Sequence, residues 1–115
     1  MRRWRWALLV LILAVGATLA STLIPATVRA VYPESCERGC DLVAAGWPWP
    51  YLVDHPGISP TGSVSLVDGM LGVDIVWPGA LAVSFAFWLC LSSLIVFLLQ
   101  AAISRLGRLV SAAER

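Results

Sequence analysis

Two cysteines four residues apart offer the most specific chemistry in this sequence. Cys36 and Cys40 form a C-x₃-C pair in the stretch YPESCERGC. Thiol-exchange motifs favour two intervening residues within a thioredoxin-like unit, for which a chain of 115 residues with two long apolar segments has no room. Nearby cysteines outside the cytoplasm most often form a disulfide. We therefore predict a structural Cys36–Cys40 disulfide, with redox activity, metal binding or unbridged thiols as alternatives.

His55 is the single histidine and, with the two cysteines, completes a set of three candidate metal ligands. Structural zinc sites usually consist of two close pairs of ligands, and one histidine fifteen residues after Cys40 is a poor second pair. Asp54 does not orient His55 as a catalytic partner, because neighbours along an extended chain point in opposite directions. Asp54 is expected instead to accept hydrogen bonds from backbone amides in a turn. Cys36, Cys40 and His55 remain weak metal candidates; we expect no cofactor and no enzymatic activity.

The stretch AGWPWPY, residues 45–51, interleaves three aromatic rings with two prolines. Proline cannot continue a helix or donate to a sheet ladder, which excludes a helix interior and a central strand. Tryptophan and tyrosine have an apolar ring with a polar edge, which suits the headgroup level of a membrane and the centre of a protein interface. We predict an aromatic ridge that contacts lipid or a neighbouring subunit rather than a small ligand. The residues of this predicted interface are Trp47, Trp49, Tyr51 and Trp77.

Two long uncharged segments account for most of the remaining chain. No charged residue occurs from Trp6 to Val28 or from Ile75 to Ser104, runs of 23 and 30 residues. A bilayer core of about 30 Å requires about 20 apolar residues as a helix. Only 13% of the residues are charged, against about a quarter in soluble domains. We predict transmembrane helices over 6–27 and 77–103, preceded by a short segment 1–5 and followed by a basic tail 104–115.

The distribution of arginines predicts the orientation. Three arginines precede the first segment and three follow the second, whereas the residues between them contain two arginines against six acidic residues, a net charge of −4. The positive-inside rule then places both termini in the cytoplasm and residues 28–76 outside. The absence of lysine in an alanine-rich chain is typical of a GC-rich genome. The predicted location is the bacterial cytoplasmic (inner) membrane.

The first apolar segment has an alternative interpretation as a cleaved secretory signal. It follows an arginine-rich start and ends at Val28-Arg29-Ala30, a small-residue cleavage pattern. Cleavage after residue 30 would leave a protein with a single span. However, the apolar stretch from Ala7 to Ile24 contains 18 residues, more than the 7–15 of a typical signal core. This length favours a retained helix.

The segment between the spans is predicted to be an irregular cap of about 50 residues, because all seven prolines lie between Pro25 and Pro78. Ser35 is placed to cap a short helix. Asp68-Gly69 between apolar runs predicts a small β-hairpin over 63–77, with an interfacial helix that runs directly into the second span as the alternative. A segment of this size buries too little surface to fold alone. The expected fold is an all-α membrane protein: a two-span transmembrane helical hairpin with this external loop.

Small residues recur on one face of each predicted helix. Such faces let helix backbones approach closely in lipid, where burial of apolar surface gives no net drive. We expect the two helices to touch through these faces and to leave the faces rich in Leu, Phe and Trp88 for lipid or a larger complex. The predicted packing residues are Ala14, Gly16, Ala17, Ala20, Gly79, Ala86, Cys90 and Ser93.

Several classes of function are disfavoured. The sequence has no phosphate loop, dinucleotide fingerprint or basic stripe for nucleic acid, and neither span contains the ionisable residues that mark ion paths. We predict a non-catalytic accessory or assembly subunit that contacts the lipid bilayer and binds a larger membrane protein complex, or a second copy of itself, through its helices and aromatic loop. The alternative is an extracytoplasmic thiol-disulfide or metal-binding protein using Cys36, Cys40 and His55.

Overall fold

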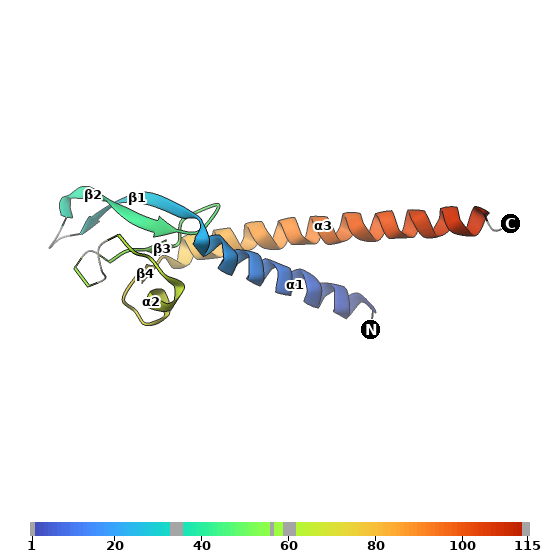
Figure 1. The fold of residues 1–115 in the computed structure, drawn as a ribbon, viewed down its shortest axis with the longest axis horizontal. Coiled ribbons are helices and arrows are strands. Elements are labelled where there is room, and N and C mark those ends of the chain that lie inside the picture. The colour runs from blue at the N-terminus through green and yellow to red at the C-terminus, as the bar shows by residue number, and fades with distance from the viewer. Residues whose placement is uncertain (1, 33–35, 56, 59–61, 114–115) are drawn as a thin grey trace.

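The computed structural model describes residues 2–32, 36–55, 57–58 and 62–113 of an elongated molecule with extents of 76 × 24 × 20 Å. Two helices of unequal length, α1 (Arg2–Ala20) and α3 (Pro78–Ala113), run antiparallel from the same side of a small sheet (Figure 1). Both helices therefore extend away from the sheet, and the shorter α1 begins part-way along α3 (Figure 1). We call the part between the two helices, residues 24–77, the cap.

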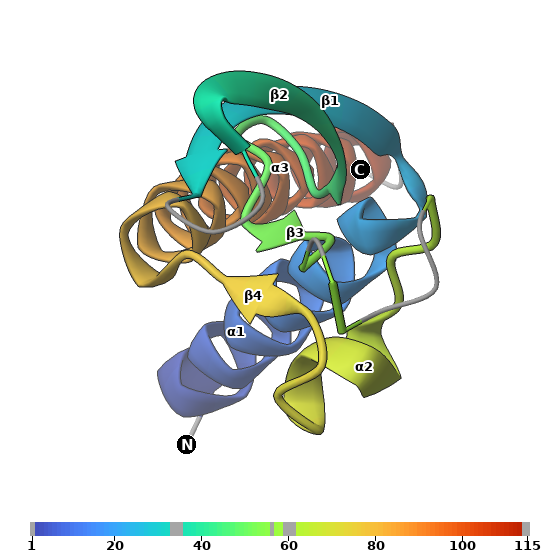
Figure 2. The same ribbon diagram turned by 90° about the vertical axis from the view of Figure 1, so that its left-hand side faces the viewer.

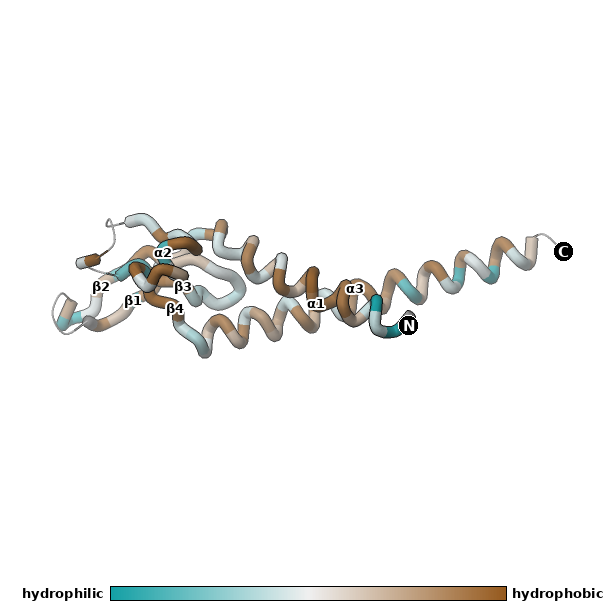
Figure 3. The backbone as a smooth tube through the Cα atoms, turned by 90° about the horizontal axis from the view of Figure 1, so that it is seen from below, coloured by the Kyte–Doolittle hydropathy of each residue, from teal (hydrophilic) through white to brown (hydrophobic). Residues whose placement is uncertain are grey.

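Both helices are long and apolar enough to cross a membrane by length and composition. Hydrophobic residues dominate them, whereas hydrophilic residues gather in the cap and near the two termini (Figure 3). The 36 residues of α3 correspond to a length of about 54 Å, well beyond a bilayer core of about 30 Å. The basic tail predicted from residue 104 is thus helical as far as Ala113.

Prolines set the boundaries of the helices next to the cap. The first helix was expected to continue to residue 27, but it gives way to a short 3₁₀ turn, η1 (Ser21–Leu23), and then to extended backbone at Ile24. A residue before proline disfavours the helical conformation, and Pro25 follows Ile24. Pro78 is the first residue of α3, a position where its missing N–H costs nothing.

The cap contains a four-stranded antiparallel sheet in the order β1-β2-β3-β4. Its bounds are β1 (Pro25–Tyr32), β2 (Cys36–Ala45), β3 (Leu52–Val53) and β4 (Ile75–Val76). The main hairpin pairs β1 with β2, from Pro25 opposite Ala45 to Tyr32 opposite Cys36. Seen from the cap end, the sheet covers the ends of both helices (Figure 2). An all-α description is therefore incomplete.

Two local predictions within the cap were wrong. The short helix expected near Ser35, which lies outside the described residues, is strand β2 from Cys36 onward. The hairpin expected over 63–77 contains a short helix instead, α2 (Leu66–Met70), followed by β4. Ser65 caps α2, because its Oγ accepts from the Asp68 backbone N–H at 3.0 Å and donates to Asp68 Oδ2 at 2.6 Å. This cap satisfies one backbone N–H at the start of the helix and outweighs the Asp-Gly turn tendency.

The core of the cap is small and consists of two clusters on opposite faces of the sheet. One cluster is formed by Leu42, Ala44 and Val53, and alternate residues of β1 pack against it: Ala26, Val28 and Ala30. This alternation with period two is what a strand with one buried face requires. The second cluster, Ala45, Tyr51 and Leu52, contacts Ala80 and Leu81 of α3 and so joins the sheet to the helix.

Candidate interaction site

The loop AGWPWPY joins β2 to β3 and runs beside the first turns of α3; we call residues 46–51 the Trp47 loop. Ser84 of α3 fixes the middle of this loop with two hydrogen bonds. The Trp49 backbone N–H donates to Ser84 Oγ at 3.3 Å, and Ser84 Oγ donates to the Trp49 carbonyl at 2.9 Å. Ser84 is completely buried. One side chain of the helix therefore satisfies both polar groups of a backbone unit that would otherwise lie unpaired against an apolar helix.

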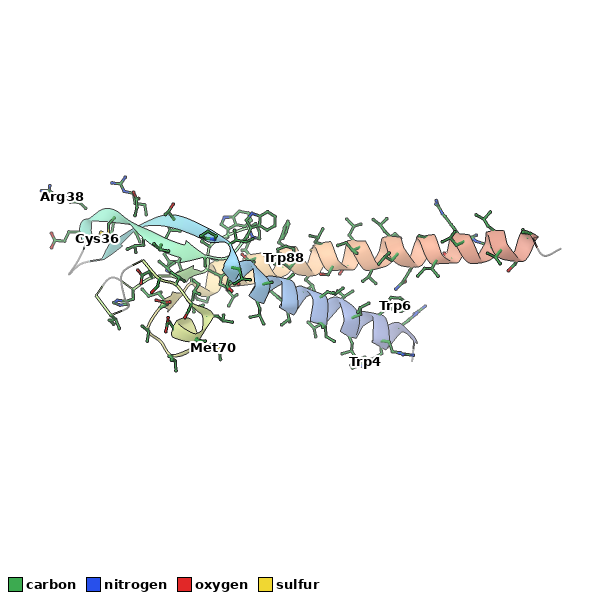
Figure 4. All side chains as sticks on the ribbon, viewed as in Figure 1. Trp4, Trp6, Cys36, Arg38, Met70 and Trp88 are labelled. Atoms are coloured by element: carbon green, nitrogen blue, oxygen red, sulfur yellow. A yellow bond between two sulfur atoms is a disulfide. The ribbon has the colours of Figure 1, made fainter. Side chains whose placement is uncertain are left out.

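Three aromatic rings gather where the Trp47 loop meets α3. The Trp47 ring lies 5.0 Å from the Phe87 ring in an edge-to-face arrangement and 5.5 Å from the Trp88 ring. Trp88 Nε1 donates a hydrogen bond to the Trp47 carbonyl at 3.0 Å. Trp88 lies at the junction between cap and helix (Figure 4). Edge-to-face aromatic pairs add stabilisation beyond the area they bury, so this cluster anchors the loop on the helix.

Tyr51 differs from the predicted aromatic ridge, because it is buried rather than displayed. Only 3% of its surface is exposed, and its hydroxyl donates to the Thr18 carbonyl of α1 at 2.5 Å and lies 3.3 Å from Ser21 Oγ. Trp47 and Trp49 remain 41% and 57% exposed. The loop thus contacts α3 through Ser84 and the aromatic cluster, and α1 through Tyr51.

Trp77, the fourth predicted interface residue, is half-buried and packs against the core cluster formed by Leu42, Ala44 and Val53. Its backbone N–H donates to the Tyr51 carbonyl at 2.7 Å. It therefore continues the β3–β4 pairing and leads directly into α3. The exposed aromatic surface of the loop is reduced to Trp47 and Trp49.

The residues through which the two helices pack agree only in part with the predicted packing residues. On α1, Ala14 is completely buried and Thr18 is buried, while Ala17 is half-buried. Gly16 and Ala20 lie on the exposed side of α1. On α3 the buried residues are Ser84, Ser92 and Val96, whereas all four predicted residues are exposed: Gly79, Ala86, Cys90 and Ser93.

The contacts of the Trp47 loop explain why α3 turns a different face inward from the predicted one. At 3.6 residues per turn, the predicted small-residue stripe lies roughly opposite the face that carries Ser84, Trp88 and Ser92. Ser84 and Trp88 make the hydrogen bonds to the loop, so that face must point inward. The expectation that the Trp88 face would meet lipid or a complex is therefore reversed. The predicted small-residue face of α3 therefore points outward, whereas on α1 Ala14 faces inward and Gly16 and Ala20 point outward.

Cys36 and Cys40 are joined in a disulfide with a Cα–Cα distance of 5.8 Å. Four residues of regular strand would separate the Cα atoms by about 13 Å, so β2 bulges here, opposite the register shift between Ala30 and Tyr32. Gly39, with φ of +80°, supplies the backbone conformation for the bulge. Cys36 lies at the tip of the cap, away from the helices (Figure 4).

The weak metal candidates Cys36, Cys40 and His55 are not brought together as a metal site. Within the described ranges, no three His, Cys, Asp or Glu side chains are placed to hold a metal ion. Both thiols are already used in the disulfide. His55 follows the short strand β3, whereas the disulfide lies at the distal end of the β1–β2 hairpin.

Two buried aspartates organise the segment before α2. Asp54 Oδ2 accepts from the Gly62 backbone N–H at 3.0 Å, which confirms the predicted turn role. Asp74 Oδ2 accepts from the Ser65 backbone N–H at 3.1 Å. Asp74 was not predicted as a structural residue. Asp74 directly precedes β4, which pairs with β3. Its structural role could not be recognised from the sequence, because it depends on that pairing.

Ser84→Ala is expected to lower the free energy of unfolding by about 2 kcal/mol, because it leaves both backbone groups of Trp49 without their partner. The loss is measurable as a lower thermal unfolding temperature of the detergent-solubilised chain. Ser93→Ala is the matched control, since the Ser93 hydroxyl is exposed and donates only to Leu89 of its own helix. An equal change in both variants would contradict the role of Ser84 in holding the loop.

The fold and the site together define a class of protein: a hairpin of two long apolar helices closed at one end by a four-stranded cap. Comparisons with protein-family models, curated proteins and solved structures give no match. Function must therefore be argued from the exposed surfaces of the helices and of the Trp47 loop.

Proposed function

We propose that this chain is a small integral membrane accessory subunit that binds helices of a larger membrane protein complex. The observation that supports this most directly is the position of the small residues. Apart from the neighbouring residues of its own helix, no described atom lies within 4 Å of the point where a Cβ would stand on Gly16 or Gly79. Small residues let helices associate closely in lipid, and here they are left open after the hairpin has formed.

The location of the aromatic cluster supports placement across a bilayer. With Arg5 and Arg105 at one boundary, a core of about 30 Å ends about 20 residues along α3, near residue 85. Trp47, Phe87 and Trp88 lie close to that level. Tryptophan is enriched at membrane–water interfaces, and Trp4 and Trp6 supply the equivalent residues near the opposite boundary (Figure 4).

The arginine distribution supports an orientation with both termini in the bacterial cytoplasm and the cap outside. A disulfide persists in the oxidising environment outside the cytoplasm, which is consistent with Cys36 and Cys40 in the cap. We also propose that residues 1–30 are retained. Cleavage after Ala30 would remove α1 and most of β1, including the strand residues that pair with Cys40–Ala45.

Gly16→Leu is expected to leave the hairpin folded and to reduce retention of the partner at least tenfold. Leucine fits because no described atom is close, and it favours a helix interior by about 0.8 kcal/mol over glycine. The added side chain keeps a partner helix from approaching closely. The measurement is mild-detergent purification from native membranes, with quantification of each co-purifying membrane protein.

Leu11→Phe is the control, because Leu11 is exposed and lies well away from Gly16 around α1. Its added bulk should leave retention unchanged. Full retention of every partner by both Gly16→Leu and Gly79→Leu would overturn the proposal that these faces bind a partner. Self-association would be detected instead as loss of a crosslinked homodimer in the same variants.

A further inference from the structure

At the end of the hairpin far from the cap, α1 and α3 enclose an open cleft of about 570 Å³. The two helices separate toward this end (Figure 1). Polar groups mark the mouth of the cleft, where Arg5 of α1 faces Gln100 and Ser104 of α3. The other lining residues are Trp6, Leu9 and Ile103.

A second hollow of about 350 Å³ shares Trp6 and Gln100 with this cleft and continues between the helices toward the cap. Its remaining lining is mostly apolar and consists of Ala7, Val10, Ser93, Val96 and Phe97. The two hollows adjoin at Trp6 and Gln100. We call them together the groove: polar and cationic residues lie at its mouth, and mostly apolar residues line the part nearer the cap.

The mouth of this groove is positively charged without a nearby compensating carboxylate. Arg3, Arg5, Arg105 and Arg108 lie at this end, and the sequences of both helices contain no Asp or Glu. Glu114 is the single acidic residue nearby in the sequence and lies outside the described residues. The first turn of α1 also presents the positive end of its helix dipole without an acidic residue to offset it.

The length of the groove matches one leaflet of a bilayer. From Ser104 to Ser93 the helix rises by about 16 Å, and half of a bilayer core is about 15 Å. The guanidinium of an arginine is suited to bidentate hydrogen bonding with phosphate. A partner helix in the same groove would have to bring its own anionic group to the level of Arg5.

We propose that this groove binds one phospholipid with an anionic headgroup from the leaflet on the side of the termini. Arg5 pairs with the lipid phosphate, the Gln100 side-chain amide donates a further hydrogen bond, and one acyl chain lies along the apolar interior past Val10 and Val96. The inference uses the membrane placement of the proposed function but does not depend on any protein partner.

The test is native mass spectrometry of the full-length chain in detergent micelles containing phosphatidylglycerol or phosphatidylcholine with identical acyl chains. Both lipids carry a phosphate, but the choline cation of phosphatidylcholine cancels its charge and is repelled by the cationic mouth. The wild-type chain should therefore retain phosphatidylglycerol about tenfold more strongly. Arg5→Gln should abolish this preference, and Arg5→Lys should restore part of it, because lysine keeps the charge but not the fork of donors. Arg108→Gln is the control, since Arg108 does not line the groove.

Three results would overturn the proposal. The first is equal retention of the two lipids by the wild-type chain. The second is an equal loss in Arg5→Gln and Arg108→Gln, which would indicate a general surface-charge effect. The third is displacement of phosphatidylglycerol by millimolar inorganic phosphate, which would indicate an anion site without a role for the acyl chain. Since no partner is present, failure here is distinguishable from failure of the partner-binding proposal.

Discussion

Tyr51→Ala is expected to lower the free energy of unfolding by about 4 kcal/mol, the largest effect of any single substitution proposed for this chain. The ring is almost completely buried between the cap and the helices, so its removal leaves a cavity. The hydroxyl is also lost, and with it the hydrogen bond to the Thr18 carbonyl. The cap should then separate from α1, and the thermal unfolding temperature in detergent should fall.

One further variant separates the contribution of the Tyr51 hydroxyl from that of its ring, and another serves as a control. Tyr51→Phe keeps the ring and removes only the hydroxyl, for which a loss of about 1–2 kcal/mol is expected. Trp49→Ala is the matched control in the same loop, because its side chain is largely exposed and its bonds to Ser84 use backbone atoms. A destabilisation by Trp49→Ala as large as that by Tyr51→Ala would contradict the assignment of Tyr51 as the internal anchor.

Gly46→Ala is expected to cost about 3 kcal/mol, through backbone strain and a direct clash. Gly46 has φ of +114°, a conformation that residues with a Cβ rarely adopt. A Cβ at this position would lie 2.6 Å from the Tyr51 ring. The substitution should therefore displace Tyr51 from α1, which is measurable as increased proteolytic cleavage of the cap.

Gly57→Ala separates the effect of backbone strain from the effect of the clash with the Tyr51 ring. Gly57 has nearly the same φ, +112°, but apart from its chain neighbours no described atom lies within 4 Å of its Cβ position. It should show the strain alone, about 1 kcal/mol, and leave the cap as resistant to proteolysis as in the wild-type chain. Equal effects of the two substitutions would mean that close packing of Gly46 under Tyr51 contributes nothing.

The two long helices and their approximate limits could be predicted from the sequence, because length, hydropathy and the absence of charge are local properties. The Cys36–Cys40 disulfide could also be predicted from the sequence, since two cysteines so close together have few other partners. The turn role of Asp54 followed from its own side chain, which readily bonds to nearby backbone amides.

The pattern in the cap was less easily interpreted. The alternation of Ala26, Val28 and Ala30 with exposed residues is a strand signal, but the segment was divided between the end of the predicted helix 6–27 and the start of an irregular cap. The Asp68-Gly69 pair predicted a turn, but Ser65 three residues earlier completed a helix cap. At the first place, pairing with β2 decided the outcome. At the second, the local cap at Ser65 outweighed the turn tendency.

What the sequence determined by itself is the pair of apolar helices, the cationic ends beside both termini and the acidic cap, because these depend on residue types along short stretches. The tertiary structure alone decided which side of each helix faces inward. A helical stripe of small residues fits a neighbour equally well inside or outside the hairpin. The hydrogen bonds of Ser84 and Trp88 to the Trp47 loop, and of Tyr51 to α1, set the rotation of the helices and left Gly16 and Gly79 on the outside.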